Sequence, residues 1–79
     1  MQAGLLCFDN EPSRTIAAKA TAAAERFQEK FGVVPDVCYV NAKALTEGEM
    51  RIPFHNGQLR LLPANNILMN HFWIGLGGS

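Results

Sequence analysis

The chain has two cysteines and two histidines, the residue types that could act as nucleophile, base or metal ligand. A thiol such as Cys38 and an imidazole such as His71 would form a nucleophile and its base if a third group oriented the ring. Candidates for that third group are Asp9, Asp36 and Asn70. The corresponding hypothesis is a small enzyme with a pocket at a subunit interface, lined by Trp73 and Tyr39.

Two features favour a non-catalytic protein over that enzyme. No catalytic signature surrounds Cys38 or His71, and a chain of 79 residues leaves little room for a substrate pocket of about 300 Å³ or more. We therefore assign no catalytic residue and keep His71 and Cys38 as the candidates of the alternative hypothesis.

The same side chains, together with His55, have the chemistry of zinc ligands, but their spacing does not fit a site. Structural zinc sites use close pairs such as Cys-x-x-Cys, and neither Cys7 nor Cys38 has such a partner. No glycine-rich phosphate loop is present either. We expect no metal and no cofactor. Because both cysteines lie in apolar runs, inert buried thiols are favoured over a reactive thiol or a disulfide.

The charge balance restricts the partners. Seven basic and seven acidic residues give a net charge of zero, so no long-range field attracts nucleic acid or an anionic membrane. Weak nucleic-acid binding through Arg51 and Arg60, with Lys43 nearby, is a further alternative. No apolar run approaches the ~18 residues of a membrane span, and no secretion signal is evident. We expect a cytoplasmic protein without membrane contact.

The first half of the chain predicts a strand followed by a helix. The apolar run 3–8 is typical of a buried strand. Asp9 or Asn10 is the expected N-cap of a helix that begins near residue 11 and ends at Gly32. The apolar face of that helix comprises Ile16, Ala20, Ala23, Ala24, Phe27 and Phe31.

Residues 36–41, β-branched and aromatic in composition, predict a second strand parallel to the first. The connector 42–48 has room for one helical turn. The segment 50–62 then predicts a β-hairpin around Asn56-Gly57, the dipeptide preferred in a type I′ turn. The expected register pairs Phe54 with Leu59 and Ile52 with Leu61, so that all four side chains share one face. Pro53 favours an edge position for the first arm of this hairpin.

The last run, 67–76, is apolar on both faces after a turn at 63–66. A strand with one face in water alternates with polar residues, so something must cover the second face. Another copy of the chain, paired face to face or edge to edge, would do so. The expected interface residues are Ile67, Met69, His71, Phe72 and Trp73, because aromatic and methionine side chains are enriched at interface cores.

These patterns predict a single α+β domain over residues 1–76 with a flexible tail at 77–79. The expected order is β-α-β-β-β-β, with one helix on a mixed sheet and an antiparallel meander in the C-terminal half. The favoured hypothesis is that the protein is a small association module that acts first as a homodimer. A docking surface for another protein is the second form of this hypothesis.

Overall fold

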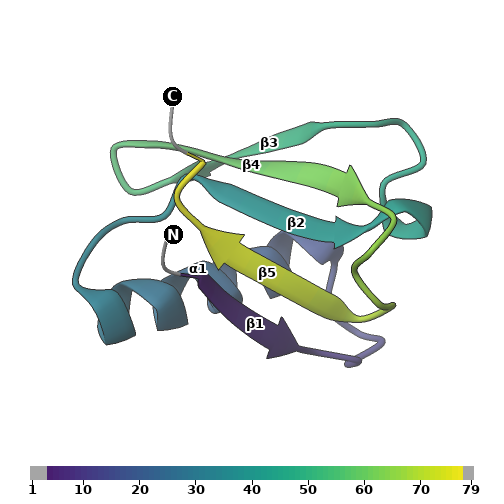
Figure 1. Ribbon diagram of the computed structural model, residues 1–79, viewed down its shortest axis with the longest axis horizontal. Helices are drawn as coiled ribbons and strands as arrows, with labels where there is room; N and C mark the ends of the chain where they lie inside the picture. The colour runs from purple at the N-terminus through teal and green to yellow at the C-terminus, as the bar shows by residue number, and fades with distance from the viewer. Residues whose placement is uncertain (1–3, 78–79) are drawn as a thin grey trace.

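The computed structural model describes residues 4–77 and contains one helix packed on a five-stranded sheet (Figure 1). The elements are β1 (Gly4–Phe8), α1 (Ile16–Phe31), β2 (Val37–Asn41), the short 3₁₀ helix η1 (Ala42–Ala44), β3 (Met50–Phe54), β4 (Gly57–Ala64) and β5 (His71–Gly75). The predicted α+β class, element order and single helix on a mixed sheet are confirmed. Residues 1–3 and 78–79, which include the start of the first expected strand and most of the expected tail, lie outside the described residues.

The strand order is β1-β5-β2-β4-β3. β5 is antiparallel to both β1 and β2, so the two strands joined by α1 run parallel, as predicted, with β5 between them (Figure 1). β2 and β4 are parallel. The expected antiparallel meander is therefore correct only for the β3–β4 hairpin. β5 does not pair with that hairpin and instead lies between β1 and β2, the two strands that α1 connects. An apolar strand gains most burial in such an interior position.

The helix begins later than the sequence predicted. Thr15 is the N-cap, and its Oγ1 accepts a hydrogen bond from the Ala18 N–H at 3.1 Å. The carboxylate of Asp9 instead accepts from the Glu11 N–H at 3.0 Å, which holds a turn before the helix. Asp9 forms this local turn instead of an N-cap because a short carboxylate side chain can also accept a hydrogen bond from the backbone N–H two residues further on. The end of α1 is as predicted: Gly32 is left-handed, with φ 74°.

The hairpin buries the predicted side chains in a different register. The loop consists of His55 and Asn56, and Phe54 pairs with Gly57 instead of Leu59. His55 carries the positive φ, 54°, which histidine adopts more readily than most residues. The shift is two residues, and a two-residue shift leaves every side chain on its original face. The prediction that Ile52, Phe54, Leu59 and Leu61 share one face is thus confirmed, and that face is buried. β3 is an edge strand, as Pro53 indicated.

The hydrophobic core lies between α1 and one face of the sheet. Its helix contribution is the predicted stripe, centred on Phe27, which is fully buried. Phe72 and Ile74 of β5 face the helix, as do Cys7 and Cys38. The core also contains Ala20, Ala23, Ala24, Val40, Leu45 and the four hairpin side chains. A single helix covers only one face, so the opposite face of the sheet has no layer over it among residues 4–77.

Candidate functional site

The uncovered face of the sheet carries an apolar row that crosses four strands. Leu6 pairs with Trp73, Trp73 with Tyr39, and Tyr39 with Leu62. Residues paired in this way have Cβ atoms about 5 Å apart, so the four side chains are neighbours on one face. We call this surface the open face. It comprises Leu6, Phe8, Tyr39, Leu62, His71 and Trp73.

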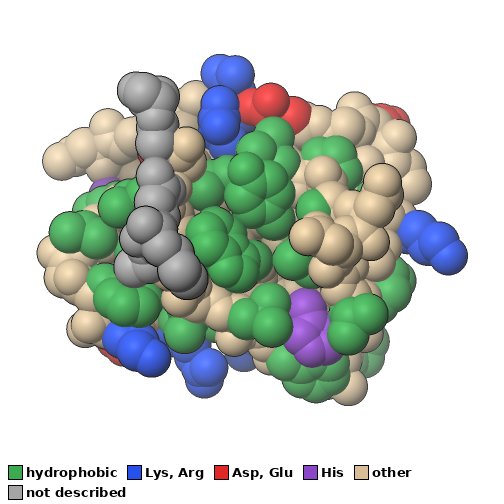
Figure 2. Space-filling model, viewed as in Figure 1, with side chains coloured by type: hydrophobic (Ala, Val, Ile, Leu, Met, Phe, Trp, Pro, Cys, Tyr) green, Lys and Arg blue, Asp and Glu red, His purple; other side chains and the backbone are tan. Residues whose placement is uncertain are grey.

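The open face is accessible, most of all at β1. Leu6 is 57% and Phe8 58% exposed, whereas Tyr39, Leu62 and Trp73 are half-buried. Hydrophobic side chains gather over the middle of this face, and charged ones lie toward its rim (Figure 2). Isolated exposed apolar side chains are ordinary, but a contiguous set of this kind is typical of an interaction site.

Trp73 is held in place from two sides. Its ring lies 5.7 Å from that of Tyr39, tilted by 51°. On the other side it leans over Gly4, where an added Cβ would overlap the indole and stand 2.7 Å from Nε1. Only glycine permits this approach, because any larger residue would push the ring away. The indole is therefore a preorganised part of the open face.

A shallow hollow of about 300 Å³ adjoins this row. Tyr39 and Trp73 form one wall, and Ala64, Asn66 and Ile67 form the other. The loop that carries Ile67 is tied to the sheet because the side-chain amide of Asn41 donates to the Ile67 carbonyl at 2.8 Å. The walls are mainly apolar, so the hollow fits a hydrophobic side chain better than a charged substrate.

His71 lies at the corner of the open face. Its ring is 5.0 Å from that of Phe8, and Nδ1 is 2.9 Å from the Met69 carbonyl oxygen. In the neutral ring, the proton on Nδ1 donates to that carbonyl and leaves Nε2 as the acceptor. A backbone carbonyl thus orients the imidazole, in the role that the sequence hypothesis gave to Asp9, Asp36 or Asn70.

The structure does not bring Cys38 and His71 together, because they lie on opposite faces of the sheet. Cys38 is fully buried against α1, and burial raises the pKa of its thiol to about 12. Cys7 also faces α1, where burial raises its pKa and Arg26 opposes that rise. Cys7 lies across β5 from Val40, and Cys38 is two residues further along β2, so the two Cα atoms are about 12 Å apart, which is too far for a disulfide.

No three metal-ligating side chains come together within residues 4–77. His55 is exposed at the hairpin tip, and His71 lies on the face away from both thiols.

The predicted interface residues separate into three groups. His71 and Trp73 belong to the open face, and Ile67 lines its hollow. Met69 is 52% exposed, but it lies beside Ile16 and the start of α1. The inclusion of Phe72 was wrong: it alternates with Trp73 onto the helix side, where it is part of the core.

Leu6, Phe8 and Leu62 belong to the open face and were absent from the predicted interface. The run 3–8 is apolar on both faces and was interpreted as a buried strand, whereas β1 is an edge strand with one face uncovered. No signal in that run distinguishes the two cases, since edge position depends on the order of strands far apart in the sequence.

The proposed basic patch is only partly assembled. Arg51 and Arg60 are direct cross-strand partners, but the Arg51 Nε donates to the Glu49 carboxylate at 2.8 Å. Arg60 is paired with Val37, at the start of β2, whereas Lys43 comes after the end of that strand. The two ends of β2 are about 13 Å apart. Two arginines therefore lie together, one of them already paired, and Lys43 is not among them.

Of the expected tail 77–79, only Gly77 lies within the described residues. The Gly77 N–H donates to the Asp36 carboxylate at 2.6 Å, so Gly77 is attached to the domain.

Comparisons with protein-family models, with curated proteins and with solved structures give no match for this chain. Between residues 4 and 77, the helices are too short or too polar to cross a membrane.

Proposed function

We propose that this protein is a non-catalytic association module that forms a homodimer by stacking the open faces of two copies. The observation that supports this proposal is the row Leu6, Trp73, Tyr39 and Leu62, which crosses four strands without a layer over it. Stacked sheets pack about 10 Å apart with side chains interdigitated. The protruding Leu6 and Phe8 of one copy would then enter the hollow beside Trp73 of the other.

A second copy suits this surface because the row carries no charge. A twofold interface places the same patch on both partners, so any charged side chain near its centre would meet its own like charge. Leucine, tyrosine and tryptophan avoid that repulsion and the cost of burying a charge. Tyrosine and tryptophan are also among the residues enriched at interface cores.

Face-to-face packing covers these side chains better than edge-to-edge pairing. Trp73 and Tyr39 belong to β5 and β2, which are interior strands. A second sheet added at the β1 edge would leave both uncovered, whereas a stacked sheet would cover them. We therefore reduce the two arrangements that the sequence left open to the stacked one.

The size of the face predicts a weak dimer. The open face spans four strands, and four strands spaced about 4.8 Å apart and about 17 Å long offer roughly 330 Å² in projection. Stable interfaces use about 800 Å² per partner, so association should depend on concentration in the micromolar range or above.

The test is the molar mass in solution, by light scattering behind a sizing column over a hundredfold dilution series. The wild type should pass from dimer to monomer on dilution. The double variant Leu6→Lys and Phe8→Lys should stay monomeric while it keeps its thermal unfolding transition, since both side chains are more than half exposed. Trp73→Asp is less suitable because Trp73 also packs on Gly4, so the variant should be monomeric or unstable.

The matched control is Val33→Lys with Val34→Lys, which exposes two further lysines away from the open face, between α1 and β2. These valines are 45% and 44% exposed, and the control should dimerise like the wild type. Arg60→Ala should also change little. A wild type that is monomeric up to about 1 mM, or a Leu6/Phe8 double variant that still dimerises, would contradict the proposal.

A further inference from the structure

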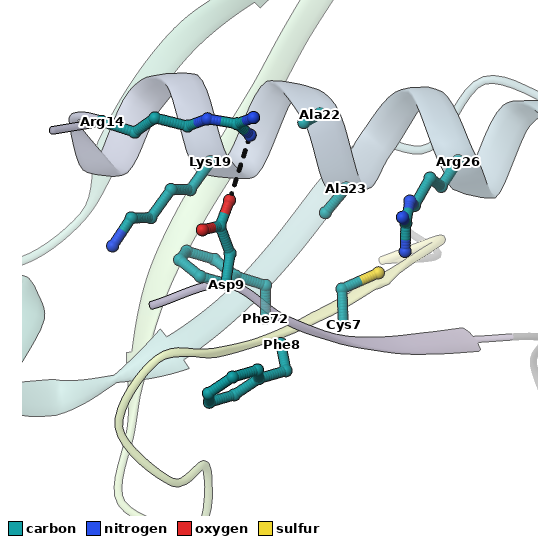
Figure 3. A pocket seen from close by; sticks show the side chains of 9 residues that line it. All are labelled: Cys7, Phe8, Asp9, Arg14, Lys19, Ala22, Ala23, Arg26 and Phe72. Atoms are coloured by element: carbon teal, nitrogen blue, oxygen red, sulfur yellow. Dashed lines mark hydrogen bonds and ion pairs between the residues drawn. The ribbon is translucent and has the colours of Figure 1, made fainter. Parts of the chain in front are cut away.

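A second recess lies on the other side of β1, between that strand and α1. Its volume is about 260 Å³. Figure 3 shows Arg14, Lys19 and Arg26 extending on the side of α1 that borders β1, with Cys7 and Asp9 reaching up from the strand. We call this recess the basic groove. It is bounded by the free edge of the sheet, and among its lining residues it shares Phe8 with the open face.

The basic groove carries excess positive charge. It contains three cationic side chains and one carboxylate, that of Asp9. Asp9 is already paired with Arg14 at 3.2 Å and also accepts the Glu11 N–H. Across the described part of the chain, Lys19 and Arg26 form no ion pair. The Cys7 thiol does not offset them, because burial raises its pKa and keeps it neutral near pH 7.

The positive charges are spread along the groove. Lys19 and Arg26 are seven residues apart on α1, which places them on one side of the helix about 10.5 Å apart. Arg14 lies five residues before Lys19, in the segment that precedes the helix. A small anion would contact only one end of this arrangement, whereas an extended chain with several carboxylates would contact all of it.

The β1 edge beside the groove has free backbone groups. The Asp9 N–H donates to the Asn70 carbonyl at 2.9 Å, so Asp9 belongs to the residues of this strand that bond to β5. In an antiparallel pair such residues alternate, so Leu6 and Phe8 direct their N–H and C=O groups away from β5. β1 ends the sheet, and no described strand pairs with its outer side. This edge can therefore accept another strand.

We propose that the β1 edge and the basic groove together bind an extended peptide segment with alternating acidic and apolar residues, which adds a sixth strand to the sheet. The acidic side chains, on the helix side, meet Arg14, Lys19 and Arg26. The apolar side chains, on the other side, lie next to Leu6 and Phe8. The backbone of the segment bonds to Leu6 and Phe8, as in other cases of strand addition.

The charges also argue against a second copy at this edge. Twofold pairing of two β1 edges would put both α1 helices on the same side of the enlarged sheet, with their cationic side chains facing each other. Charges beside an edge strand discourage such self-pairing. The same cations attract a strand of opposite charge, so the edge distinguishes an acidic partner from its own copy. Face-to-face dimerisation leaves the backbone edge of β1 free but covers the Leu6 and Phe8 side chains, which an added strand would also contact. The two proposals are therefore distinguished by their readouts, the molar mass for the dimer and the protection of the Leu6 and Phe8 amides for the added strand.

The test uses two synthetic decapeptides, one alternating valine with glutamate and one alternating valine with lysine. Each is titrated into the ¹⁵N-labelled full chain and followed by amide chemical shifts and by hydrogen exchange. The glutamate peptide should bind at least about tenfold more tightly than the lysine peptide, a difference that corresponds to about 1.4 kcal/mol. Binding should protect the amides of Leu6 and Phe8 from exchange.

Two matched double variants change the net charge by the same amount, one in the basic groove and one on another surface. Lys19→Glu with Arg26→Glu should weaken binding of the glutamate peptide about tenfold or more. Arg51→Glu with Arg60→Glu, which changes the charge by the same amount on β3 and β4, should leave it within about threefold. Thermal unfolding of each variant verifies its fold, and the milder Lys19→Gln with Arg26→Gln replaces the first variant if it does not fold.

Three results would overturn the proposal. One is equal affinity for the two peptides, because the basic groove would then contribute nothing. Another is binding that leaves the Leu6 and Phe8 amides unprotected, because no strand would have been added. The third is the absence of binding by the glutamate peptide at about 1 mM.

Discussion

Replacing Gly4 by alanine tests whether the close approach of Trp73 is part of the fold. At most sites that tolerate a side chain, Gly→Ala stabilises a protein by about 0.4 to 1 kcal/mol, because the unfolded chain loses freedom. At Gly4, which has no positive φ, the new Cβ would overlap the Trp73 ring and stand 2.7 Å from Nε1, whereas ordinary contacts begin near 3.4 Å. The indole must therefore move off the strand.

The expected sign is a loss of stability. Forcing a methyl group into a packed contact costs about 1 to 3 kcal/mol. Because the overlap with the Trp73 ring is severe, a cost of about 2 to 3 kcal/mol applies here, and subtracting the entropic gain leaves roughly 1 to 2.5 kcal/mol of net destabilisation. For a domain of this size the melting temperature should fall by roughly 5 to 15 °C. Because Trp73 is the single tryptophan, its fluorescence should also shift toward longer wavelength as the ring becomes more exposed.

The assay is thermal unfolding followed by circular dichroism and tryptophan emission. Gly57→Ala is the matched control, since no atom lies within 4 Å of its added Cβ, and its melting temperature should stay the same or rise. In a Trp73→Ala background, Gly4→Ala should no longer destabilise, which isolates the pairwise contact. A Gly4→Ala protein as stable as the wild type, with unchanged emission, would refute the reasoning.

Three other substitutions test local parts of the structure. Thr15→Ala removes the acceptor for the Ala18 N–H and should cost about 1 kcal/mol in urea unfolding, while Thr15→Ser should restore most of it. Asn41→Ala removes the donor to the Ile67 carbonyl, so amide hydrogen exchange in residues 65–70 should accelerate. Asn41→Asp, which cannot donate, should have the same effect. Unchanged protection in both variants would contradict a role of this hydrogen bond in holding the loop. Burial raises the pKa of the Cys38 thiol from 9.0 to about 12. Between pH 9 and 12 the thiol therefore ionises in the unfolded chain but not in the folded one, so the free energy of unfolding should decline with pH. The contribution of this thiol is about 1.4 kcal/mol per pH unit. Cys38→Ala should show a shallower decline in urea unfolding at about pH 8 and 10.5, and identical slopes would contradict the burial of the thiol.

Local patterns in the sequence predicted the parts of the fold that depend on neighbouring residues. The spacing of apolar residues identified the buried stripe of α1 around Phe27, and Gly32 marked its end. Alternation identified the inward side chains of the hairpin even though the register was wrong, since a two-residue shift preserves the face. The helix start was misplaced because Asp9, Asn10 and Thr15 are all good N-caps, and only one of them is followed directly by continuous helix.

The candidate site was predictable only in part. The doubly apolar character of the last run indicated an uncovered face at Trp73, and this local inference located the centre of the open face. The loop before β5 was assigned to the strand, and Phe72 was placed at the interface although alternation directs it to the core.

The tertiary structure alone decided which segments meet. Leu6, Tyr39, Leu62 and Trp73 come from four separate strands, and they form a row because β5 inserts between β1 and β2. That insertion depends on the summed pairing and packing of the whole sheet, which no local pattern encodes. It also places β1 at an edge beside α1, and so creates the basic groove. The sequence by itself determined the elements and their inward faces, because these follow from periods of two and 3.6 residues. The strand order, the open face and the groove were determined only by contacts between residues distant in the chain.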